Sequence, residues 1–187
     1  FGMGLFGVCF WIFRNYTKSI LKLAFLALLF LHLLMKAPVW HLISRIDLTG
    51  GSTGYHRYLL FDAAIHNFFS WFILGVKDTG VWGTGLVDIT NQYILEGVRG
   101  GVITLVLFVM IITKCFKQIG IVRKIFINNP LMQKYIWSLG VLLFAHCITF
   151  ISVSYFGQLV FFYNLLIAMI SSLSYLLLRS EELENSY

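Results

Sequence analysis

The sequence predicts an all-α membrane protein, a polytopic transmembrane helical bundle with one large loop that contains an interfacial amphipathic helix. The 187-residue chain is 59% hydrophobic and only 12% charged, and its mean hydropathy is +0.84. These values lie outside the usual range of soluble domains, and the apolar residues form runs long enough to cross a bilayer. Residues 36–90 form a polar interlude between such runs. We therefore expect lipid bilayer around the helices and chemistry in the interlude.

Five apolar segments follow one another, with approximate bounds 1–13, 19–37, 91–113, 131–151 and 155–178. The first is too short to cross a bilayer alone, so we expect the chain to be the C-terminal part of one longer membrane domain. Residues 114–129 are predicted to form a basic loop that ends at Asn128, Asn129 and Pro130, a stop-and-restart signal. Residues 179–187 are predicted to form a polar tail.

The basic residues predict which side of the membrane each loop occupies. Nine of the 14 Lys and Arg residues flank short loops on one side of the predicted spans: Arg14, Lys18, Lys22, Lys114, Lys117, Arg123, Lys124, Lys134 and Arg179. The positive-inside rule places that side in the cytoplasm. The loop at about residues 36–90 then lies on the outer side.

Within this loop, a Gly- and Ser-rich turn precedes a predicted amphipathic helix over residues 55–73, which Ser52 or Thr53 could cap. Asp62, His66 and Ser70 recur every four residues and form its polar stripe. We expect this helix to lie along the outer membrane surface or to pack on the ends of the spans.

Several classes of chemistry have no signature in the sequence. It contains no GxxxxGK[ST], HExxH, CxxC or GxSxG pattern, and its three cysteines lie far apart. We expect no metal, no cofactor and no nucleic-acid partner. The loop instead offers separated Arg and Lys residues, which bind diphosphate oxygens and stabilise a leaving diphosphate. It also offers carboxylates and imidazoles that can accept a hydroxyl proton, a combination that suits glycosyl transfer from a lipid diphosphate.

Three local patterns carry a resemblance to a known family. An Arg follows the Gly-rich turn in Gly54-Tyr-His-Arg57, a short Gly-containing loop spans Trp82-Gly-Thr-Gly85, and Asn91-Gln-Tyr93 precedes paired glycines in Gly97-Val-Arg-Gly-Gly101. With them, residues 36–108 resemble the large periplasmic loop and following helix of the bacterial O-antigen ligase and O-antigen polymerase superfamily. The hairpin at residues 145–158 also looks similar to members of this superfamily.

The resemblance implies a metal-independent glycosyltransferase of the bacterial inner membrane that acts in lipopolysaccharide or other surface polysaccharide biosynthesis. It would transfer or polymerise a polyprenyl-diphosphate-linked glycan in the periplasm, onto an acceptor glycan or lipid. Arg57 matches the loop Arg that holds the donor diphosphate, and Asn91 matches the motif Asn. The family's proposed base, a His before that Asn, is Thr90 in this chain. Either Asp88 or His56 replaces it, or this branch lacks ligase activity of the familiar type.

Each candidate residue also has a purely structural interpretation. Arg57 could cap a helix or pair with a lipid phosphate, and Asp88 could cap the third span as well as act as base. Lys36 and Arg45 could anchor to phosphate headgroups or assist donor binding. Arg99 lies three residues after Glu96, so an ion pair competes with a place on a substrate path.

Two other classes of function compete with the enzyme. A transporter of lipid-linked glycan would need polar residues along its spans, whereas these spans are mostly apolar. A non-catalytic membrane subunit of an envelope assembly would use the loop only for docking. Its loop charges should tolerate Lys in place of Arg, which bidentate diphosphate binding would not.

Overall fold

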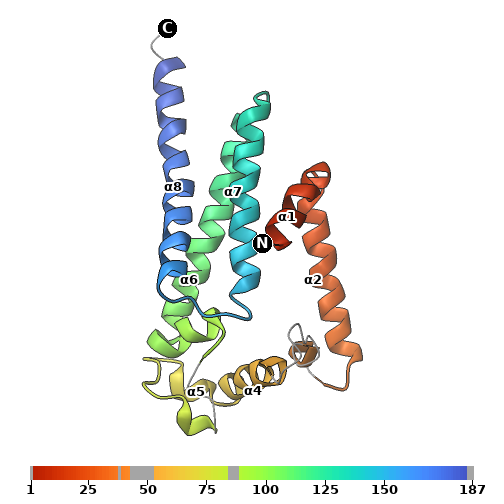
Figure 1. Cartoon of the computed structure of the whole chain (residues 1–187), viewed down its shortest axis with the longest axis vertical. Coiled ribbons are helices and arrows are strands. Elements are labelled where there is room, and N and C mark those ends of the chain that lie inside the picture. Colours follow the sequence, from red (N-terminus) through yellow and green to blue (C-terminus); the bar gives the residue numbers. More distant parts are fainter. Residues whose placement is uncertain (1, 38, 43–52, 84–88, 185–187) are drawn as a thin grey trace. The chain divides into compact units, whose positions relative to one another are not determined.

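The computed structural model describes residues 2–37, 39–42, 53–83 and 89–184. Every regular element in these ranges is a helix, which confirms the all-α class (Figure 1). In chain order they are α1 (Gly2–Cys9), η1 (Phe10–Phe13), α2 (Thr17–Leu34), η2 (Val39–His41), α4 (Thr53–His66), α5 (Phe68–Trp71), η3 (Gly80–Trp82), α6 (Gln92–Ile125), α7 (Pro130–Thr149) and α8 (Gln158–Glu184).

Among the described residues, three helices are long and apolar enough to cross a membrane, namely α2, α6 and α7. They overlap the spans predicted at 19–37, 91–113 and 131–151. Gly2–Phe13 and Gln158–Leu173 are apolar helices of shorter length. None of the residues of α2 is buried by protein, so its Leu and Phe side chains are available for contact with lipid. The helices therefore indicate a membrane protein.

The predicted loop at residues 114–129 is wrong, because α6 continues through most of this basic segment to Ile125. Lys, Arg and Gln are good helix formers, and leaving the bilayer does not by itself end a helix. The stop-and-restart signal is confirmed: Asn129 Oδ1 accepts the Met132 N–H at 3.1 Å, and Pro130 opens α7. The predicted polar tail is likewise helical as far as Glu184.

The chain divides into two compact units. The first unit contains Phe1–Cys9, Val106–Ile151 and Tyr155–Tyr187, and the second contains Phe10–Leu105 with Ser152–Ser154. The boundary passes through α6, so residues 92–105 belong to the second unit and residues 106–125 to the first.

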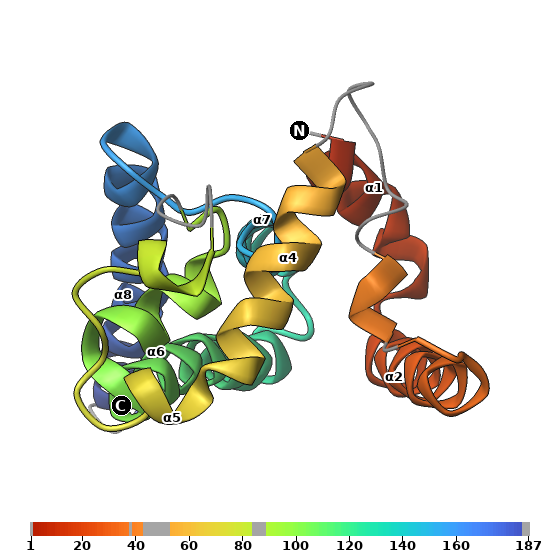
Figure 2. The same ribbon diagram turned by 90° about the horizontal axis from the view of Figure 1, so that it is seen from below.

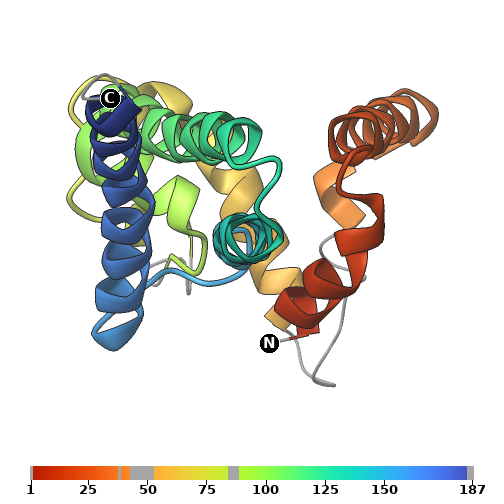
Figure 3. The same ribbon diagram turned by 90° about the horizontal axis from the view of Figure 1, so that it is seen from above.

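In the first unit, α7 lies between other helices. Figure 3 looks nearly along its axis, with α8 and the green part of α6 passing it at an angle. At α1, the Trp137 indole N–H donates to the Gly7 carbonyl at 3.1 Å, and Gly7 lies directly against the side chain of Val141. Gly7 therefore lets α1 approach α7 closely.

An aromatic cluster holds the end of α7 in the first unit. The ring of Phe150, which is only 1% exposed, lies 4.7 Å from that of Tyr155, 5.1 Å from Tyr163 and 5.3 Å from Phe108 between ring centroids. His146 Nδ1 lies 2.5 Å from the Tyr155 hydroxyl. Tyr155 lies between α7 and α8, outside both helices, and its burial raises the pKa of its phenol above the usual range.

The second unit contains α2, η2, α4, α5, η3 and the start of α6. Figure 2 shows α4 and α5 following one another, with the first turns of α6 beside α5. The continuous helix predicted over residues 55–73 is wrong, because α4 ends at His66 and α5 begins at Phe68. Asn67 Nδ2 donates to the Ala63 carbonyl at 2.9 Å. Such side-chain bonds to the backbone compete with the helical pattern and favour a break.

Candidate functional site

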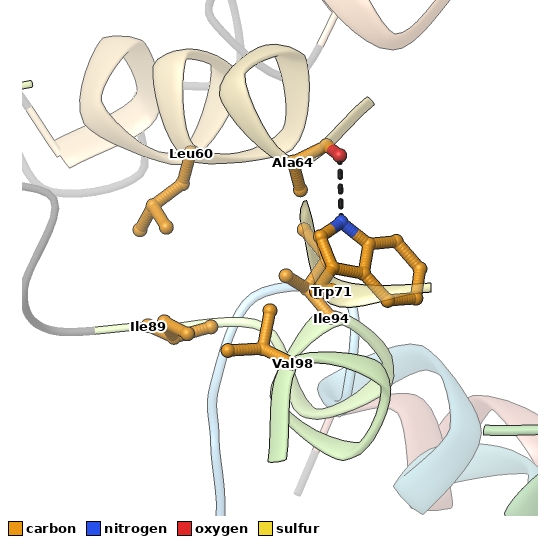
Figure 4. Packing of buried hydrophobic residues seen from close by; sticks show 6 residues of the cluster. All are labelled: Leu60, Ala64, Trp71, Ile89, Ile94 and Val98. Carbon is orange, nitrogen blue, oxygen red and sulfur yellow. Dashed lines mark hydrogen bonds between the residues drawn. The ribbon is translucent and has the colours of Figure 1, made fainter. Parts of the chain in front are cut away.

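A buried cluster joins α4, α5 and the start of α6 within the second unit. It consists of Leu60, Ala64, Trp71, Ile89, Ile94 and Val98 (Figure 4). The Trp71 indole N–H donates to the Ala64 carbonyl at 2.9 Å, so the ring is fixed by a buried hydrogen bond as well as by packing. The α4 helix and the first turns of α6 are therefore held by one shared core.

A break in α6 fastens the segment after α5 to this core. Gly100 and Gly101 have non-helical backbone angles, and Gly101 has φ +77° and ψ −176°. Around the break, Val76 N–H donates to the Val98 carbonyl at 2.7 Å, and Val102 N–H donates to the Phe72 carbonyl at 2.9 Å. The paired glycines thus form a joint between a helix and a loop.

This joint requires glycine for two physical reasons. The backbone of Gly101 lies in a region that residues with a Cβ rarely adopt. A Cβ there would also collide with the Ile73 carbonyl oxygen. Gly75 has φ +78°, and a Cβ added there would likewise collide with the Val98 carbonyl oxygen. We define the Gly101 joint as residues 72–76 together with residues 98–102.

Arg57 and His56 lie in the first turns of α4, and both side chains are half-buried. Leu60 follows Arg57 by three residues and belongs to the buried cluster, as does Ile89, which immediately precedes Thr90 and Asn91. Leu60, which lies three residues after Arg57, and Ile89, which lies two residues before Asn91, therefore belong to the same buried cluster. No hydrogen bond or ion pair of Arg57 is described within the ranges that the structure covers.

Asn91 caps α6. Its side chain is 6% exposed, and Oδ1 accepts the Ile94 N–H at 3.0 Å. This bond gives Asn91 a structural role at the start of α6. The preceding Thr90 has a buried hydroxyl without a hydrogen-bond partner among the described residues.

Other predicted site residues are more dispersed. Arg99 is exposed on α6, and the expected ion pair with Glu96 is absent from the described contacts. Glu96 Oε1 instead accepts from Gln92 Nε2 at 2.6 Å, because residues four apart meet on one helix face. Lys36 is exposed just after the end of α2, and no described contact joins it to Arg57. Arg45 and Asp88 lie outside the described residues.

Sequence reasoning missed an open depression of about 430 Å³ beside α4. We call it the Trp82 depression; its lining consists of Leu59, Asp62, Ala63, His66, Asn67, Trp82 and Gly83. His66 Nδ1 lies 2.9 Å from the Asp62 carbonyl and 3.3 Å from Asp62 Oδ2. The sequence signal for this depression is the four-residue spacing of Asp62 and His66, which predicts one polar face of an interfacial helix on which His66 is a structural residue more often than a base.

The described residues hold no group of three or more His, Cys, Asp or Glu that could bind a metal ion together. No protein-family model matches the chain, and neither a curated protein nor a solved structure matches it.

Proposed function

We propose that this protein is a membrane glycosyltransferase that transfers or polymerises a polyprenyl-diphosphate-linked glycan at the outer face of the bacterial inner membrane. The observation that carries the proposal is the shared core of α4 and α6. Leu60 and Ile89 join the helix that bears Arg57 to the segment that leads into Asn91. These are the two positions at which the chain matches the superfamily pattern.

In this proposal, Arg57 binds the donor diphosphate. A guanidinium group presents two parallel N–H donors to phosphate oxygens and stabilises the charge that grows as the diphosphate leaves. Lys36 and Arg45 would add positive charge around the same diphosphate, and Arg99 would border its path. Asn91 would hold the start of α6 in place through its bond to Ile94 N–H and would contact the substrate.

The acceptor supplies a sugar hydroxyl, whose oxygen attacks the anomeric carbon of the donor. The bond between that carbon and the diphosphate oxygen breaks, and the diphosphate keeps the electron pair. A base must take the hydroxyl proton. Asp88 and His56 are the candidates that the sequence supplies for this role.

The test compares Arg57→Lys with Arg123→Lys in the full-length protein. Arg123 belongs to the first unit, where its guanidinium lies 5.6 Å from the Trp137 ring, so its replacement controls for the loss of any Arg. Both variants would be placed in liposomes with lipid-linked glycan from host membranes. We expect transfer to fall about 100-fold for Arg57→Lys, since Lys cannot reproduce bidentate binding, and to persist for Arg123→Lys.

Equal transfer by the two variants would contradict donor binding by Arg57. If wild-type protein showed no transfer while Arg57→Lys still supported polysaccharide export in cells, a docking subunit would be the better description. Accumulation of the lipid-linked precursor on the outer side of the membrane in Arg57→Lys cells would support the enzyme.

A further inference from the structure

The short helix α5 and the turn that follows it present an apolar surface to their surroundings. Four side chains form this surface, which we call the Phe69 patch: Phe69 (90% exposed), Phe72 (40%), Ile73 (69%) and Leu74 (85%). Gly75 N–H donates to the Trp71 carbonyl at 2.9 Å, so the helical turn continues past α5. Phe69, Phe72 and Ile73 therefore lie three and four residues apart on one face. Neighbouring exposed apolar side chains of this kind mark a contact with a partner or a membrane.

The other face of the same turn is fixed to the core of the second unit. Trp71 is buried, and its ring lies 5.0 Å from that of Phe68 between centroids, at an interplanar angle of 82°. The Phe68 ring also lies 5.0 Å from the Phe72 ring and packs against the buried cluster that contains Trp71. The turn is therefore amphipathic, and the packing of one face fixes the direction of the exposed face.

The Gly101 joint sets the level of the Phe69 patch along α6. The hydrogen bonds of Val76 to Val98 and of Val102 to Phe72 hold the segment that carries the patch beside residues 98–102 of α6. Arg99 is exposed at this level, and residues 100–113, which follow it, include no charged residue. Because a charged side chain is costly within hydrocarbon, a membrane that α6 crosses has its boundary near Arg99. The Phe69 patch therefore lies at this boundary.

Directly after the joint, α6 has an apolar face of its own. Ile103, Val106 and Met110 are exposed and lie on one side of the helix, at spacings of three and four residues. In a helix that crosses a membrane, such a face contacts lipid acyl chains. Lys77, three residues after Leu74, is exposed, and cationic side chains at a membrane boundary attract headgroup phosphates. An apolar patch with a cation beside it has the composition of an interfacial anchor.

We propose that the Phe69 patch inserts into the lipid leaflet on the loop side of the membrane and anchors α4 and α5 there. Acyl chains cover Phe69, Ile73 and Leu74, while Lys77 stays among the headgroups. Because α4 and Trp71 share one buried cluster, the anchor also fixes the height of α4 at the membrane surface. This inference goes beyond the glycosyltransferase function and does not depend on it.

The experiment measures the depth of single nitroxide labels in the full-length protein in liposomes. The native cysteines are replaced by alanine, and one cysteine at a time is introduced as Phe69→Cys, Ile73→Cys or Leu74→Cys. Collisions with oxygen, which concentrates in hydrocarbon, are compared with collisions with a water-soluble nickel chelate. We expect the three labels to lie about 5–10 Å below the headgroups, the depth of an interfacial apolar face.

Two controls calibrate the depth. Lys77→Cys, at an exposed position of the same loop, should collide mainly with the nickel chelate. Leu107→Cys, at an exposed position of α6 beyond the joint, should collide mainly with oxygen.

Each outcome decides the proposal. Labels on the Phe69 patch that collide with the nickel chelate as often as the label at position 77 would place the patch in water and overturn the anchor. Labels that are shielded from both reagents would show that protein covers the patch, as a second copy of the chain or another subunit would, and overturn it equally. Oxygen collisions that approach those at position 107 support it. Glycan transfer is not measured here, so a failure of the proposed function leaves this result unchanged.

Discussion

The two units of the molecule form the hydrogen bonds of their backbone N–H and carbonyl groups in different ways. In the first unit, long helices bond their own backbone, and side chains such as Phe150 and Val141 make the contacts between elements. In the second unit, irregular backbone bonds to a broken helix, as at Val76 with Val98 and Val102 with Phe72. A helix forms its backbone hydrogen bonds internally and therefore suits a bilayer, whereas irregular backbone needs hydrogen-bond partners from other parts of the protein. The backbone that depends on hydrogen bonds from other segments therefore belongs to the second unit, around the Gly101 joint.

The largest expected effect comes from breaking the Gly101 joint. Gly101→Ala would place a Cβ against the Ile73 carbonyl and force an unfavourable φ, so we expect a loss of about 3 kcal/mol or more. Thermal unfolding in detergent, followed by tryptophan fluorescence, measures it. Gly120→Ala is the control, since Gly120 lies on the same helix with nothing within 4 Å of its added Cβ. That change should leave stability equal or higher, because Ala favours helix.

A smaller effect is expected from the buried indole of the second unit. Trp71→Phe retains most of the packing but leaves the Ala64 carbonyl without its 2.9 Å bond, which should cost about 1–3 kcal/mol. The same substitution at Trp11, which is only half-buried, provides the comparison in the unfolding experiment. Equal midpoints for the two variants would show that the Trp71 hydrogen bond does not stabilise the core.

For the first unit, Tyr155→Phe removes the hydroxyl that lies 2.5 Å from His146 while preserving the aromatic cluster. We expect a loss of about 1 kcal/mol, because hydrogen bonds in membrane proteins contribute modestly. Reaction of the half-buried Cys147 thiol with a maleimide dye during heating would follow this region. Tyr175→Phe, at a 65% exposed position, should leave the profile unchanged. A matching shift in both variants would mean that the His146 contact contributes nothing.

A stability effect of similar size, and the sharpest functional contrast, come from two helix caps, of which Asn91 is buried and Asn129 is exposed. Asn91 and Asn129 each accept a backbone N–H at the start of a helix, at 3.0 and 3.1 Å. Either Asn→Ala change should cost about 1 kcal/mol. We expect only Asn91→Ala to reduce glycan transfer in liposomes beyond its loss of folded protein. Equal transfer per folded molecule in the two variants would confine Asn91 to its capping role.

The parts of the fold that the sequence predicts are those set by local chemistry. Apolar runs located α2 and α7 within a few residues, and Asn129 with Pro130 correctly marked a helix start. The extension of α6 to Ile125 was missed because hydropathy reports the bilayer boundary and not the end of a helix. The break at Asn67 was missed because periodicity continues across it, from His66 to Ser70.

The candidate site was less predictable because its contacts join distant parts of the sequence. The paired glycines are visible as a pattern, but the backbone that packs against Gly101 lies at Phe72 and Ile73, more than twenty residues earlier in the chain. The sequence singles out Asn91 as a candidate site residue, whereas the hydrogen bond that its side chain accepts from Ile94 N–H is seen only in the structure. Trp82 and His66 were noted separately, since spacing along the chain does not reveal that they line one depression.

The Gly101 joint also bears on the order in which the two units fold during synthesis. Its hydrogen-bonded partners are complete once residue 102 has been synthesised, and most of the second unit is the continuous stretch Phe10–Leu105. The first unit must bring Gly7 to Trp137 across 130 residues, which only late synthesis allows. We therefore expect the second unit to fold during translation and insertion, with α1 docking on α7 afterwards.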